Sequence, residues 1–330
     1  MTQATGTAEA ARDTLLHISE TERGERARRA AAGALVLRVA QLSLSGTPDE
    51  FTLRRAQAEV ARLEKSAEKS ILLRAVRVLE DGGAAAPLSA ALVSYACELE
   101  KTRRLPEADA AIGLALALDE GSGATALHAA RPARKMGDRQ RALALYCAAR
   151  DLDGGDGQIA RFAAIGEAVV SDDGIRMLGA VIRRALRAGD AEAAAVGLEE
   201  RAALRRAEGD RRGAARDLWS AAARYTDPVD RARAAHELAG AALALGDAGA
   251  AREALLVALA WGDAPQKDHA RTRLHTLSRD LGDQVGMRRW RSFQRPSLVS
   301  LSAYRPAPAA RSLAPRLLAW RESMGQRAAS

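Results

Sequence analysis

Histidines are the first residues to consider for chemistry, because imidazole can bind metals and transfer protons near neutral pH. The chain has five, and His236-Glu237 begins like the helical zinc-protease motif. Gly240 stands where that motif needs its second histidine, and His269 and His275 are spaced for different faces of a helix. We therefore expect no metal site, and exposed or groove-lining positions suit these histidines better.

Two glycine-containing stretches resemble ligand loops. GSGATA at 121–126 fits the loose dinucleotide fingerprint, but two acids precede it and would repel a pyrophosphate. DLDGGDG at 151–157 offers carboxylates, yet Asp156 occupies the sixth position, where a calcium loop needs glycine. A turn that caps the next helix explains this run better. Without a Ser-His-Asp, paired-carboxylate or Cys-His arrangement, we expect neither a cofactor nor an enzyme.

The elements that carry these residues are predicted to be helices. The chain is crowded with Ala, Leu, Arg and Glu, and aromatic residues make up 3% of it. No apolar run approaches the roughly 20 residues of a membrane-spanning helix, and the N-terminal residues lack the pattern of a signal peptide. Two cysteines, Cys97 and Cys147, fit a reducing compartment better than a disulfide scaffold. An all-α, soluble, cytoplasmic protein is expected.

Gly-Asp pairs divide the chain into helical hairpins. Five of them begin at residues 137, 189, 209, 246 and 282, and two others, at 155 and 262, are set aside because they follow second helices. Glycine ends one helix in the left-handed conformation, and aspartate caps the next by accepting its free N–H groups. The last two intervals, 37 and 36 residues, are regular, whereas the interval of 20 has room for one helix. We therefore expect an irregular stack of hairpins with a break in the repeat near 155–210.

One stretch resembles the tetratricopeptide family closely. Residues 235–265, AHELAGAALALGDAGAAREALLVALAWGDAP, reproduce the family's order of large and small residues around the Gly246-Asp247 turn. A second stretch, 137–154, resembles the family's second helix, with Ala142, Tyr146 and Ala149 at the signature positions. Weaker units lie around Gly209 and from Leu105. The resemblance covers roughly 105–290 and implies a TPR-like α-solenoid.

The resemblance also implies a binding groove. In tetratricopeptide proteins the first helices of the hairpins line a concave groove that binds peptides. Carried over to the best-matched units, the groove positions are Arg233, His236, Thr272, Thr276 and Arg279. These polar and basic side chains would favour an acidic or carboxylate-bearing segment of a partner. That they are merely solvated carries equal weight.

The first 104 residues are expected to form a helical N-terminal region, either divergent repeats or a cap. Thr47-Pro48-Asp49-Glu50 is a strong start signal and predicts one helix from Pro48 to about Leu79. Asp81-Gly82-Gly83 ends it, and Pro87 opens another helix to about Arg104. Farther along, Pro132 is expected to kink or break the first helix of its hairpin.

The C-terminal extension, residues 291–330, is basic and broken by prolines. Residues 287–330 hold nine arginines and one acid, which accounts for the whole formal net charge of +8. This segment begins RRWRSFQRP, and its candidate contact residues are Arg288, Arg289, Trp290, Arg291, Phe293 and Arg295. They could cover the last repeat, dock on an acidic protein or an anionic membrane, or pair with phosphates and stack on bases. Packing on the last repeat is the first choice.

A scaffold or adaptor of bacterial type, which binds a partner protein through the groove, the basic segment or both, is the leading hypothesis. A helical repeat protein that binds nucleic acid through the C-terminal arginines is the alternative. Partner identity and oligomeric state are left open, because repeat folds host many roles.

Overall fold

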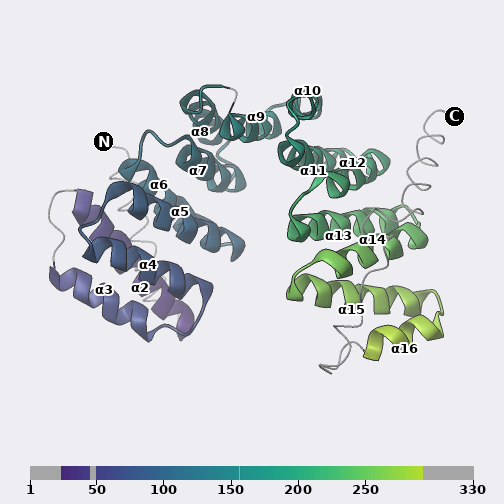
Figure 1. Cartoon of the computed structure of the whole chain (residues 1–330), viewed down its shortest axis with the longest axis horizontal. Coiled ribbons are helices and arrows are strands. Elements are labelled where there is room, and N and C mark those ends of the chain that lie inside the picture. The colour runs from purple at the N-terminus through teal and green to yellow at the C-terminus, as the bar shows by residue number, and fades with distance from the viewer. Residues whose placement is uncertain (1–23, 45–49, 156, 293–330) are drawn as a thin grey trace. The chain divides into compact units, whose positions relative to one another are not determined.

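The computed structural model describes residues 24–44, 50–155 and 157–292, which form 15 helices and no strand (Figure 1). Consecutive helices pack on one another as a series of hairpins within each of two compact units, which divide between Val170 and Ser171. This confirms the expected all-α fold of stacked helical hairpins. No helix in the described ranges is long and apolar enough to cross a membrane.

Unit 1 contains eight described helices: α2 (Glu25–Leu44), α3 (Glu50–Arg62), α4 (Ala67–Glu80), α5 (Ala85–Lys101), α6 (Leu105–Leu118), α7 (Gly123–Lys135), α8 (Arg139–Leu152) and α9 (Gln158–Val170). Helix α2 contacts α3, α4 and α6, and its middle is buried almost all round. The expected boundary at 104/105 coincides with the turn from α5 to α6, and these two helices share one apolar core with α2 to α4.

The predicted helix from Pro48 to Leu79 is wrong, because α3 and α4 are separate helices. Ser66 takes an extended conformation and caps α4 by accepting from Lys69 N, at 3.1 Å. The Lys69 ammonium reaches back and donates to the carbonyls of Ala61 and Leu63, at 2.7 and 2.6 Å. One short segment therefore satisfies both the end of α3 and the start of α4. Residues 47–49 of the start signal lie outside the described ranges.

Pro132 does not break α7, which continues to Lys135. The residue lies in the last turn, where the missing N–H removes a single hydrogen bond of the helix. The stretch at 151–157 caps the next helix, since an Asp153 carboxylate oxygen accepts from Ala160 N at 2.8 Å. The stretch at 121–126 joins two helices, so it has no strand before it, and Ser122 caps α7.

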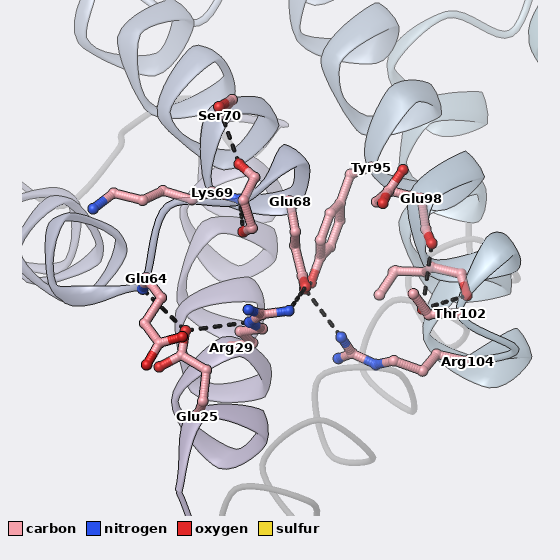
Figure 2. Close-up of polar contacts among 12 residues, drawn as sticks. Glu25, Arg29, Glu64, Glu68, Lys69, Ser70, Tyr95, Glu98, Thr102 and Arg104 are labelled. Carbon is pink, nitrogen blue, oxygen red and sulfur yellow. Dashed lines mark hydrogen bonds and ion pairs between the residues drawn. The ribbon is translucent and has the colours of Figure 1, made fainter. Parts of the chain in front are cut away.

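A polar network is buried in the core of unit 1 (Figure 2). Arg104, at the start of α6, donates to Glu68 of α4 at 3.0 Å and to Glu107 at 3.2 Å. The Tyr95 hydroxyl of α5 donates to Glu68 at 3.5 Å, and Arg29 of α2 approaches Glu68 at 3.8 Å. Burial raises the pKa of Tyr95, and the nearby Glu68 carboxylate raises it further. The network ties four helices together.

Unit 2 contains seven described helices: α10 (Gly174–Arg187), α11 (Ala191–Ala207), α12 (Arg211–Arg224), α13 (Pro228–Ala244), α14 (Ala248–Trp261), α15 (Ala264–Asp280) and α16 (Gln284–Ser292). Its largest core is built mainly from alanines and leucines of α12 to α15. Alanines let neighbouring helices approach closely, which explains how so few aromatic rings suffice.

The Gly-Asp pairs act as expected in both units. All five glycines have positive φ values, from 66° at Gly282 to 87° at Gly209. Each aspartate side chain accepts from a backbone N–H three residues later, for example Asp247 from Ala250 at 2.8 Å. Every pair therefore ends one helix and starts the next.

The caps also show where the repeat becomes regular. The second helices α12, α14 and α16 follow Asp210, Asp247 and Asp283, at intervals of 37 and 36 residues. The first helices α11, α13 and α15 follow Asp190, Asp227 and Asp263 at the same intervals. The interval of 20 residues is therefore the single helix α11, as expected, and three hairpins of equal period follow residue 190.

Candidate partner-binding face

Helices α11, α13 and α15 form the first layer of the three regular hairpins, and we call their shared polar side the first-helix face. Their side chains contact one another from hairpin to hairpin. Thr226, just before α13, donates to Glu192 of α11 at 3.3 Å, and Gln266 of α15 donates to the carbonyl of Val229 at 3.2 Å. Partners on this face are thus 34 to 37 residues apart, which is close to one repeat.

Arg233 of α13 points toward α11. It pairs with Glu199 and with Asp230, the latter at 3.0 Å, and its guanidinium lies 5.6 Å from the centre of the Tyr225 ring. The Tyr225 hydroxyl also donates to Glu199. Burial acts to lower the pKa of Arg233, but Glu199 and Tyr225 raise it overall. The charge of this predicted groove residue is therefore compensated within the protein.

His236 of α13 points toward α15. Its Nε2 lies 3.1 Å from Nη1 of Arg273, and its ring centre lies 4.2 Å from that of His269, with the planes tilted by 43°. An arginine can only donate, so Nε2 of His236 is the acceptor and carries no proton. Burial lowers the pKa of His236 to about 4, with added repulsion from His269 and Arg273. The imidazole is neutral at pH 7.

Arg273 and His269 are the residues of this face that the sequence argument missed. Among the described residues, Arg273 has no carboxylate partner, and its side chain contacts His236. The nearby Glu237 is occupied by Arg206 of α11 at 2.9 Å. Repeat spacing is the signal that could have found Arg273, because it follows His236 by 37 residues, one repeat later.

The other predicted groove residues lie on the exposed side of α15. The hydroxyls of Thr272 and Thr276 donate to carbonyls four residues earlier, at 3.0 and 3.1 Å, so their oxygens remain open to a further donor. Within the described part of the chain, Arg279 pairs with its neighbour Asp280, at 3.3 Å. Helical spacing places Thr272, Arg273 and Thr276 on one stripe with His269.

The C-terminal candidates fall in and beyond the last described helix, α16. Trp290 is buried in the core of unit 2, so its ring packs on the last hairpin and is not exposed for stacking on a base. Arg288 is exposed and donates to the carbonyl of Gln284 at 3.4 Å. The side chains of Arg289 and Arg291, and all of Phe293 and Arg295, lie outside what the structure describes.

Unit 1 contains a cysteine–histidine pair whose members are 31 residues apart, so no short sequence motif predicts it. Both cysteines are free thiols, and Sγ of Cys97 on α5 lies 3.6 Å from Nδ1 of His128 on α7. Burial raises the pKa of the Cys97 thiol and lowers the pKa of His128. Both shifts favour the neutral forms, which is the reverse of an activated thiolate–imidazolium pair. No group of three or more metal-ligating side chains occurs in the described ranges.

Comparisons with known proteins add no identification. No protein-family model matches the sequence, and no curated protein matches it either. The geometry of the first-helix face must therefore support any function on its own.

Proposed function

We propose that this chain is a tetratricopeptide-like adaptor that holds an acidic segment of a partner protein on the first-helix face of unit 2. The uncompensated cation Arg273, which lies beside His236 of the His236–His269 ring pair, is the observation that carries the proposal. Stacked hairpins of equal period and a face of polar side chains support the family resemblance. Two free cysteines support a reducing, cytoplasmic location, as in a bacterial adaptor.

The chemistry of the face fits a carboxylate. Arg273 uses one of its five N–H donors on His236, and the others remain for a bidentate contact with a carboxylate. His269 is exposed beside this pair, and a ring N–H of its imidazole can donate to the same carboxylate. At the α11–α13 end the charges are already paired, so we expect the acidic side chain to bind between α13 and α15.

Binding of fluorescent peptides by the full chain tests this proposal. One peptide carries Asp and Glu, and the matched control replaces them with Asn and Gln. Changing Arg273→Gln should weaken the acidic peptide about tenfold or more, as expected for the loss of a charge-assisted contact. Arg252→Gln is the control, since Arg252 lies on α14 in the second layer. Equal affinities for the two peptides, or equal effects of the two variants, would refute the proposed site.

Nucleic-acid binding by the C-terminal arginines is the second candidate, because residues 287–330 hold the whole net positive charge. If six phosphates were neutralised, affinity for RNA should fall about a thousandfold between roughly 50 and 200 mM salt. Truncation after Ser292 removes six of the nine arginines and keeps Trp290 in the core, so it should greatly weaken RNA binding but leave the acidic peptide bound. A chain that binds no RNA at the low-salt end excludes this candidate and leaves the adaptor proposal intact.

A further inference from the structure

A second cationic cluster lies outside the first-helix face, where α10, α11 and α12 meet. Asp217 of α12 is buried, with 4% of its surface exposed. Its carboxylate accepts two parallel bonds from Arg201 of α11, from Nε at 2.9 Å and from Nη2 at 2.7 Å. It also accepts from Nη1 of Arg205 at 2.9 Å. One buried carboxylate therefore fixes two guanidinium groups.

The fixed orientation leaves Nη1 of Arg201 turned away from Asp217 and toward α10. It lies 3.5 Å from the position that a Cβ atom would take at Gly179, and Nη1 of Arg183 lies 3.5 Å from the same point. The two nitrogens are therefore no more than twice that distance apart. Charge-assisted N–H···O bonds of about 2.7–2.9 Å on each side would let one tetrahedral anion bridge them.

No acceptor among the described residues fills this position. Arg183 is exposed and has no hydrogen bond or ion pair there, and Arg201 uses only Nε and Nη2. The other acid of the cluster, Asp210, faces Arg205 at 3.7 Å. The cluster therefore holds three arginines, at positions 183, 201 and 205, and two aspartates, at positions 210 and 217. The one positive charge in excess lies at the Nη1 groups of Arg183 and Arg201, which point to the same place. The absence of a side chain at Gly179 keeps the helix surface between them bare.

We propose that Arg183 and Arg201, above Gly179, form a binding site for a phosphate monoester. A dianion with three acceptor oxygens can pair with both guanidinium groups, whereas a carboxylate brings a single charge and two oxygens. Guanidinium presents donors in a planar fork that matches phosphate geometry. The site is separate from the acidic-segment site between α13 and α15, and neither requires the other.

Titration of the full chain with N-acetyl-phosphoserine amide, followed by amide NMR, tests the site. The Gly179 signal should move and saturate, and unphosphorylated serine amide should leave it unchanged. Arg183→Gln should weaken binding about tenfold, whereas Arg176→Gln on the same helix, where Arg176 pairs with Asp173, should not. Gly179→Glu should abolish binding, because its carboxylate pairs with Arg183 four residues on. Gly179→Ala puts a methyl group 3.5 Å from both Nη1 groups, at the position that the bound anion needs, and should weaken binding.

The charge of the ligand gives an independent readout. The second pKa of phosphoserine is about 6, so affinity should rise about tenfold from pH 5 to pH 7.5 as the dianion forms. Glycerol 3-phosphate and a phosphoserine peptide then distinguish a free metabolite from a modified protein as the source. A Gly179 signal that stays still, or equal binding by wild type, Arg183→Gln and Gly179→Glu, would overturn the proposal.

Discussion

Replacement of Arg104 by methionine should destabilise unit 1 strongly, because it removes the ion-pair partner of two buried carboxylates. Arg104 is 9% exposed and pairs with Glu68 and Glu107, which are 6% and 2% exposed. Removing one partner of a buried ion pair costs about 3–5 kcal/mol. Glu68 keeps Arg29 at 3.8 Å, but Glu107 loses the arginine bonded to it at 3.2 Å. We expect a loss of about 4 kcal/mol in the free energy of unfolding.

A triple variant separates two contributions to the free energy of unfolding: the cost of burying unpaired carboxylates and the stabilisation by the ion pairs themselves. Changing Arg104→Met together with Glu68→Leu and Glu107→Leu removes all three charges, and apolar replacements of a buried ionic cluster are often neutral. The triple variant should therefore recover about 2–3 kcal/mol relative to Arg104→Met. Arg54→Met is the control, since its pair with Glu50 is exposed and should be worth less than about 1 kcal/mol.

The assay follows from the distribution of tryptophans. All four lie after residue 170, at positions 219, 261, 290 and 320. Urea unfolding of the full chain followed by circular dichroism reports both units, whereas tryptophan fluorescence reports unit 2. Arg104→Met should move the dichroism transition and leave the fluorescence transition in place. If the triple variant is no more stable than Arg104→Met, unpaired buried carboxylates are not the cause of the destabilisation.

Three further changes test other contacts. His236 has a pKa of about 4 in the folded chain and about 6.5 in the unfolded chain, so its contribution to stability is present above pH 6.5 and is lost as the pH falls toward 4. After allowance for partial exposure, this loss should be about 1 kcal/mol smaller in His236→Gln than in the wild type, as measured by fluorescence-monitored unfolding. Gly166→Ala places a Cβ 2.2 Å from the Tyr146 ring and should cost about 1–3 kcal/mol by dichroism, whereas Gly121→Ala, with nothing within 4 Å, should not. Asp247→Ala removes the cap of α14 and should cost about 1 kcal/mol by fluorescence.

Local chemistry made the hairpins predictable from the sequence. A pair such as Gly246-Asp247 predicts a turn by itself, because both residues act on backbone atoms within four positions in the sequence. The break between α3 and α4 was missed for a related reason. Ser66 and Lys69 act as local caps, but neither residue type is specific enough to outweigh the continuous apolar pattern around them. Sequence patterns therefore located turns with glycine and missed a turn without it.

Contacts between helices were less accessible from the sequence. The partners Glu68 and Arg104 are 36 residues apart within the less regular first unit, where no period indicates that they meet. Trp290 stands among arginines in the sequence, which favours packing on the last repeat but leaves base stacking open, and its ring lies in the core of the last hairpin. Charge around a residue does not report which way its side chain turns, because that depends on the neighbouring helix.

In the regular hairpins of unit 2, by contrast, the repeat period does allow contacts between helices to be predicted from the sequence. On the first-helix face the partners Glu199 and Arg233 are 34 residues apart, and His236 and Arg273 are 37 apart. Each pair therefore joins equivalent turns of successive first helices. The pairs differ in charge: the α11–α13 step joins a cation to an acid, whereas the α13–α15 step joins a cation to a neutral imidazole. Because the charges are paired at the α11–α13 step and not at the α13–α15 step, the acidic segment proposed as ligand should bind at the second step, and Arg273 rather than Arg233 is expected to control binding.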